Sequence, residues 1–162
     1  MKKLSLIVFG LLLVACNLDV TNPGPVQDSF LVTEDAQLGV VNGTGRALSE
    51  AMNYVSYTGA AISREITPSG SIGSFGISLR QQEGNLDANE TSTHWSLSSR
   101  ARWMAEDGAT RMATVYGSNS SSNANYAKIL LYAGYANRLM GENFCCAVID
   151  GGAATAGSTY FD

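Results

Sequence analysis

Three segments of the chain carry apolar residues at helical spacing, and this pattern limits the fold more than any other feature. In the first segment the apolar stripe recurs at steps of three and four residues, at Leu38, Val41, Gly45, Leu48, Met52 and Val55. The stripe predicts one continuous helix that ends near Tyr57 or Thr58, and Thr33 is suited to cap its start. Glycines at 39, 43 and 45 each weaken helical propensity by up to about 1 kcal/mol. We therefore expect this helix to pack closely on a neighbour.

Two further helices are predicted. Ser92 or Thr93 can cap the second helix, which runs to about Tyr116. Its inner stripe consists of Leu97, Ala101, Met104, Gly108, Met112 and Val115. The third helix runs from about Ala124 to Met140, where Gly141 is expected to stop it. Because apolar residues lie on most of its faces, we expect it to be buried in a larger body. The fold class is therefore mainly α.

The connections between these helices differ in length. Residues 59–93 are rich in glycine, serine and asparagine, with room for a short strand near 77–81. Long loops of this kind are uncommon in compact domains and are often functional. After the third helix an apolar stretch, 144–149, is followed by the turn residues Asp150-Gly151-Gly152. Because the remaining residues form no closing element, we expect the chain to be an N-terminal fragment.

The N-terminus has the organisation of a lipoprotein signal. A basic start, Met1-Lys2-Lys3, precedes an apolar run that closes on Leu13-Val14-Ala15-Cys16. The run of about 12 residues has the length of a signal-peptide core and is too short to cross a bilayer. Its end resembles the bacterial lipobox, which predicts a signal peptide at 1–15 and lipid attachment, palmitate included, at Cys16. The alternatives are an ordinary secretory signal or a buried N-terminal helix.

The mature chain divides into a tether and a helical region. Asn22-Pro23-Gly24-Pro25 cannot continue a helix, so residues 16–29 are predicted to hold the body, residues 30–162, off the membrane. Loss of Lys2 and Lys3 changes the formal charge of −4 to about −6. The remaining cations are Lys128 and the arginines at 46, 64, 80, 100, 102, 111 and 138. They form no basic cluster, so nucleic acid is not an expected partner.

Metal and cofactor chemistry find little support in the sequence. Cys145 and Cys146 are adjacent, a spacing that strains a mutual disulfide and matches no zinc pattern. An exported protein could oxidise them, but we expect them to be buried as small hydrophobes. With His94 as the only histidine, a cysteine–histidine zinc site has too few ligands. No cofactor or metal is predicted.

A family resemblance rests on two stretches and the lipobox. The first stretch is Asn17-Leu18-Asp19-Val20-Thr21-Asn22-Pro23, and the second runs from Ala133-Gly134-Tyr135-Ala136-Asn137-Arg138 to Cys145. Together they resemble the start of SusD/RagB-family lipoproteins. The resemblance covers nearly all of this chain but about the first third of a typical member. It implies a SusD-like helical body with tetratricopeptide-like helix packing, lipid-anchored and surface-exposed at the outer membrane. It also implies a role in capping a TonB-dependent, SusC-like transporter and capturing oligosaccharide or peptide nutrients.

Candidate ligand-binding residues lie in the long loop and at the entry to the second helix. Arg80, Gln82, His94 and Trp95 combine an aromatic face with guanidinium and amide donors, which suits a sugar ring. The plainer interpretation is a surface loop followed by a packing tryptophan. Trp103 lies within the second helix, and we expect it to belong to the core.

The sequence does not support an enzyme. The carboxylate pairs Glu34/Asp35 and Glu106/Asp107 are adjacent and diverge by about 100° on a helix, and glycosidase carboxylates must flank one bond. No Gly-x-Ser-x-Gly elbow, phosphate loop or dinucleotide fingerprint is present. We therefore expect a non-catalytic nutrient-binding lipoprotein. The alternative is a lipid-anchored helical scaffold that binds a protein partner and no nutrient. A weaker option is an anchored hydrolase that has lost its catalytic half.

Overall fold

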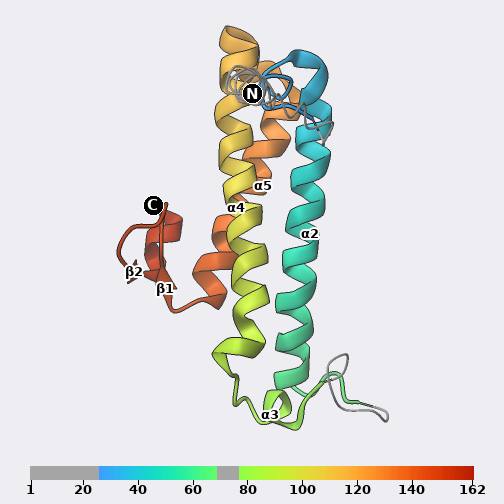
Figure 1. Cartoon of the computed structure of the whole chain (residues 1–162), viewed down its shortest axis with the longest axis vertical. Coiled ribbons are helices and arrows are strands. Elements are labelled where there is room, and N and C mark those ends of the chain that lie inside the picture. Colours follow the sequence, from blue (N-terminus) through green and yellow to red (C-terminus); the bar gives the residue numbers. More distant parts are fainter. Residues whose placement is uncertain (1–25, 69–76) are drawn as a thin grey trace, which may run out of the picture.

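Three long helices lie side by side and run in alternating directions (Figure 1). The computed structural model describes residues 26–68 and 77–162. The helices are α2 (Gln37–Ile62), α4 (Ala88–Tyr116) and α5 (Ala124–Asn143). The predicted mainly α fold is confirmed. The signal peptide, Cys16 and most of the tether lie outside the described residues. Within the described residues, none of the helices has the length and apolarity needed to span a membrane.

The first helix begins close to the predicted position. A short 3₁₀ turn, η1 (Glu34–Ala36), follows Thr33 and leads directly into α2. The Thr33 hydroxyl donates to the Phe30 carbonyl, 2.7 Å away, and makes no capping bond to η1. The side chain of Gln37 is buried and donates to the carbonyls of Leu31 and Thr33 at 2.9 and 2.7 Å. These bonds fold the N-terminal segment back onto the start of α2.

The connection between α2 and α4 differs from the sequence prediction in two places. The strand expected near 77–81 is wrong, because the chain forms a helical turn there, α3 (Leu79–Gln82), at the lower end of the bundle (Figure 1). Ser78 and Gln81 form a capping box that stabilises this turn. The second helix was placed too late, since α4 begins at Ala88 and not after Ser92 or Thr93. Asp87 caps it and forms a second capping box with Glu90.

The remaining connections are short. The polar stretch at 117–123 contains a 3₁₀ turn, η2 (Gly117–Ser122), and Asn123 caps α5 by accepting from the backbone N–H groups of Asn125 and Tyr126. Gly141 does not stop α5, which continues to Asn143. A hairpin follows, in which β1 (Cys146–Ala147) pairs antiparallel with β2 (Thr155–Ala156). The predicted turn at 150–152 connects the two strands, and a last turn, η3 (Gly157–Phe161), packs back on α5.

The buried face of the bundle is built from smaller residues than the predicted stripes. On α2, Val41 and Leu48 are buried as expected, but Leu38 and Met52 are exposed. On α4, Ala101, Gly108 and Met112 of the predicted stripe are buried, as expected. The core contains many alanines: Ala47, Ala51, Ala101, Ala105 and Ala136. Such short side chains let the helix axes approach one another closely.

Two glycines mark the closest approaches. A Cβ at Gly45 of α2 would lie 2.9 Å from the hydroxyl of Tyr132 on α5. A Cβ at Gly108 of α4 would lie 3.2 Å from side-chain atoms of both Ile129 and Val40, where all three helices meet. The expectation that glycines in the first helix permit close packing is confirmed at Gly45. It is wrong for Gly39 and Gly43, which lie at the surface.

Several expected core residues are exposed. Leu130, Leu131 and Tyr135 of α5 lie at the surface, so the described residues leave one apolar face of this helix uncovered. Cys145 and Cys146 were expected to be buried and are both exposed. They follow the end of α5, where the chain turns away from the bundle toward the hairpin.

Arg102 connects the hairpin to the bundle. Its side chain is 8% exposed and lies 2.7 Å from Glu106 and 3.6 Å from Asp150. The guanidinium also lies over the ring of Tyr160 in η3, 5.9 Å from its centroid. This side chain therefore holds together three elements that are distant in sequence: α4, the hairpin turn and η3.

Replacing Arg102 with alanine is expected to lower the free energy of unfolding by about 1–2 kcal/mol, because a buried cation–π contact and two ion pairs are lost. Amide hydrogen exchange should accelerate across residues 146–161. Arg100→Ala is the matched control, since it breaks only an exposed pair with Glu50 and should cost less than about 0.5 kcal/mol. Equal effects of the two substitutions would show that Arg102 does not hold the hairpin.

Candidate functional site

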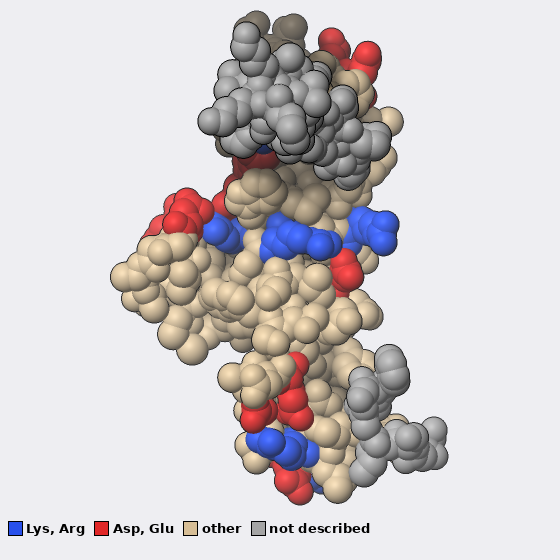
Figure 2. Space-filling view, viewed as in Figure 1, with Lys and Arg blue, Asp and Glu red and all other residues tan. Residues whose placement is uncertain are grey.

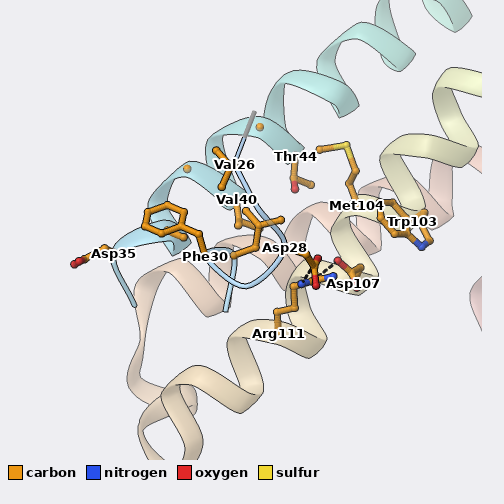
Figure 3. A pocket seen from close by; sticks show the side chains of 14 residues that line it. Val26, Asp28, Phe30, Asp35, Val40, Thr44, Trp103, Met104, Asp107 and Arg111 are labelled. Carbon is orange, nitrogen blue, oxygen red and sulfur yellow. Dashed lines mark hydrogen bonds and ion pairs between the residues drawn. The ribbon is translucent and has the colours of Figure 1, made fainter. Parts of the chain in front are cut away.

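A pocket of about 430 Å³ lies between the N-terminal segment, α2 and α4 (Figure 3). This volume falls within the range of small-molecule sites, which are commonly lined by apolar side chains with a few polar groups. Most of the lining is apolar, and its members include Val26, Phe30, Leu31, Val40, Trp103 and Met104. The polar members are Asp28, Asp35, Thr44, Asp107 and Arg111. The pocket is thus an apolar hollow with charged groups on its wall.

Two glycines on the surface of α2 help to create this hollow. Gly39 and Gly43 lie one turn apart on α2 and both line the pocket. A Cβ at Gly39 would meet no atom within 4 Å, and a Cβ at Gly43 would meet only the end of Met104, 3.9 Å away. Any larger side chain at Gly43 would therefore extend toward Met104 and occupy the cavity. The glycines leave space here that a typical helix surface would fill.

Arg111 fixes the N-terminal segment at the edge of the pocket. Its Nε donates to Asp107, one turn earlier on α4, at 2.6 Å, and its Nη1 lies 2.8 Å from Asp28 (Figure 3). The hydrogen bond to Asp107, together with the two negative charges, raises the pKa of Arg111 above its usual value. A guanidinium has five N–H donors, and these two contacts leave others free to bind a ligand.

Trp103 lies on the pocket lining and is 56% exposed. The expectation that it belongs to the core is therefore wrong. Its neighbours Ala101 and Arg102 are buried, whereas Trp103 lies on the open side of α4, one turn before Asp107. An exposed indole beside a carboxylate and a guanidinium can stack on a flat ligand while the polar groups orient it.

The four residues proposed from the sequence as ligand-binding do not line this pocket. Arg80 lies on α3, exposed, 3.5 Å from Asp87, and Gln82 is half-buried on the same turn. Trp95 is half-buried and stacks edge-on against Phe144, with ring centroids 5.2 Å apart. It therefore packs the start of the hairpin against α4, which matches the plainer interpretation of a packing tryptophan.

His94 is buried between α4 and α2. Its Nε2 lies 2.6 Å from the hydroxyl of Thr58, which is also buried, and its ring forms a T-shaped contact with the ring of Tyr54. Burial lowers the pKa of His94 below its ordinary value of 6.5, because the charged imidazolium is desolvated there. The structure thus places His94 in the contact between α2 and α4.

Acidification is expected to destabilise the protein through His94. The unfolded chain takes up a proton near pH 6.5, whereas the folded chain resists protonation until a lower pH. Stability is therefore fully present above pH 6.5 and falls as the pH drops from there toward the lowered pKa. Melting temperatures measured at about pH 7.5 and about pH 5 should differ more for the parent than for His94→Gln. The same pH dependence in both proteins would contradict this assignment.

On the face shown in Figure 2, basic side chains form a short band with acidic side chains beside them, and most of the remaining surface is uncharged. Among the described residues, no three histidine, cysteine or acidic side chains gather as metal ligands would.

The pocket could be anticipated from the sequence only in part. The glycines of the first helix predict close packing on a neighbour, but Gly39 and Gly43 leave open space beside α2. Asp28 and Arg111 form an ion pair although they lie more than eighty positions apart in the sequence. No local pattern signals such a pair. Comparison of the chain with known protein families, curated proteins and solved structures finds no match.

Proposed function

We propose that the chain is a non-catalytic, lipid-anchored binding protein of the outer membrane that captures an oligosaccharide or peptide nutrient and caps a TonB-dependent, SusC-like transporter. The lipobox ending at Cys16 and the resemblance to the SusD/RagB family support this proposal. In this interpretation α2, α4 and α5 belong to a SusD-like body with tetratricopeptide-like helix packing.

The observation that carries the proposal is the pocket with Trp103 on its lining. A sugar ring or an apolar peptide side chain would stack on the indole and enter the hollow above Gly43. Free N–H groups of Arg111 would donate to ligand hydroxyl or carbonyl oxygens, and Asp107 would accept from ligand hydroxyl or amide groups. These groups bind and orient a ligand, and the proposed mechanism needs no bond to be made or broken.

A calorimetric titration tests the proposal. The mature chain, carrying Cys16→Ser so that no lipid is attached, is titrated with one panel of oligosaccharides and one of peptides. Saturable heat is expected with members of one panel, and Trp103→Ala should abolish it. Tyr135→Ala removes another exposed aromatic ring, this one from α5, and should leave binding unchanged. Heat that survives Trp103→Ala would place the ligand elsewhere.

The alternative, a scaffold for a protein partner, is favoured by one observation. Leu130, Leu131 and Tyr135 expose an apolar face of α5, and such faces are common at protein interfaces. Both panels would then give no heat, while purified transporter would still bind the chain. In that case Leu131→Ala, and not Trp103→Ala, should weaken the complex.

A further inference from the structure

The exposed thiols of Cys145 and Cys146 lie together at the start of the hairpin. Their Sγ atoms are 3.1 Å apart, and both residues are exposed. Adjacent side chains in a regular strand point to opposite faces, so this proximity needs a local bend. The bend lies between the end of α5 at Asn143 and the first residue of β1, Cys146.

The bend is held by contacts on both sides. Ala147 and Cys146 pair with β2, and Phe144 packs its ring against Trp95 of α4. Gly157, the first residue of η3, lies against the same backbone, since a Cβ there would be 3.0 Å from the Phe144 carbonyl oxygen and 3.6 Å from that of Cys145. The fold therefore fixes the two thiols near each other before any reaction occurs.

A pair of neighbouring thiols can bind a metal ion or form a disulfide, and the surroundings favour the disulfide. A metal ion held by cysteine usually takes four ligands, and the described residues provide no group of three metal-binding side chains. A disulfide requires only the two sulfurs to approach to about 2.05 Å, a closure of about 1 Å from their present separation.

We propose that Cys145 and Cys146 form a reversible dithiol–disulfide site, oxidised by thiol exchange with a disulfide compound. One of the two cysteines attacks, as its thiolate, one sulfur of the oxidant, forms a mixed disulfide and releases one thiolate. The thiol of the other cysteine then loses its proton, and its thiolate attacks the cysteine sulfur of the mixed disulfide and expels the second thiolate. Two cysteine thiols are oxidised, the oxidant is reduced to two thiols, and the two protons pass to the released thiolates.

The geometry also explains why the bond would be reversible. Adjacent Cα atoms are about 3.8 Å apart across a trans peptide, below the usual 4.4–6.8 Å span of a disulfide. Such a bond is strained, and strained, exposed disulfides are the readily reduced and regulatory ones. A hydrogen bond with Cys145 raises the pKa of the Cys146 thiol.

Intact-mass analysis tests this site. The chain carrying Cys16→Ser has these two thiols alone, and it is reduced and then incubated with oxidised glutathione. We expect it to lose two hydrogens and retain no glutathione, and dithiothreitol should restore the original mass. Cys145→Ser and Cys146→Ser, each with a single thiol, should retain one glutathione. Two retained glutathiones, no reaction, or a covalent dimer would overturn the proposal.

A second measurement tests the contribution of the fold. The same oxidation is followed over time in buffer and in denaturing urea, with the mixed disulfide trapped by acid. Ring closure should be at least about tenfold faster in the folded chain, because the bend already brings the sulfurs together. Equal rates of closure would show that the bend does not prepare the site.

Discussion

Replacing Ile129 with alanine is expected to lower the free energy of unfolding by about 2–5 kcal/mol. Ile129 is fully buried and packs with Val41 of α2 and Met112 of α4, so that it contacts both neighbouring helices. Its terminal carbons also lie against Gly108, at the position where a Cβ would be only 3.2 Å away. Backbone fills that side, so the surroundings cannot collapse into the space left by the missing carbons. For a small domain with about 5–15 kcal/mol of stability, this loss is large.

Leu131→Ala is the matched control for that substitution. Leu131 lies two residues further along α5 and is 56% exposed. Its removal should change stability by less than about 0.5 kcal/mol, as expected for surface substitutions. Chemical denaturation of the two variants and the parent supplies the comparison. A similar loss of unfolding free energy in the two variants would contradict the orientation assigned to α5.

Replacing Gly43 with leucine is expected to weaken ligand binding at least about tenfold, or by about 1.4 kcal/mol, while the fold remains intact. A Cβ at Gly43 meets Met104 at an ordinary contact distance of 3.9 Å, and the rest of the leucine side chain would extend into the pocket. Leucine is also a better helix former than glycine by several tenths of a kcal/mol. The melting temperature should therefore stay the same or rise as affinity falls.

Gly59→Leu separates pocket filling from a general effect of the substitution. It makes the same change on the same helix, where an added Cβ meets nothing within 4 Å, and Gly59 does not line the pocket. Calorimetry should show parental affinity for this variant. Unchanged affinity in Gly43→Leu, or an equal loss in both, would contradict the assignment of the pocket as the ligand site.

The helices could be predicted from the sequence because their signals are local. Spacing of apolar residues predicts α2, α4 and α5. The early start of α4 also had a local signal, since Asp87 and Glu90 have the spacing of a capping box.

The site could not be predicted in the same way, because it depends on contacts between distant segments. Whether Trp103 faces the core or the pocket is decided by which side of α4 the other helices cover. Ala101 packs against alanines of the facing helices and Ala105 is also buried, and this orientation leaves Trp103 exposed. Similarly, the general tendency of cysteine to be buried did not apply at 145 and 146, where the chain leaves the bundle.

Fluorescence of Trp103 tests the central claim, that the pocket between the N-terminal segment, α2 and α4 takes the ligand, most directly. The chain has two tryptophans, so Trp95→Phe leaves Trp103 as the sole reporter and keeps an aromatic ring against Phe144. Titration with a ligand found by calorimetry should shift Trp103 emission to shorter wavelength, with the same dissociation constant as the heat signal. Saturable heat without any change in Trp103 emission would contradict the account.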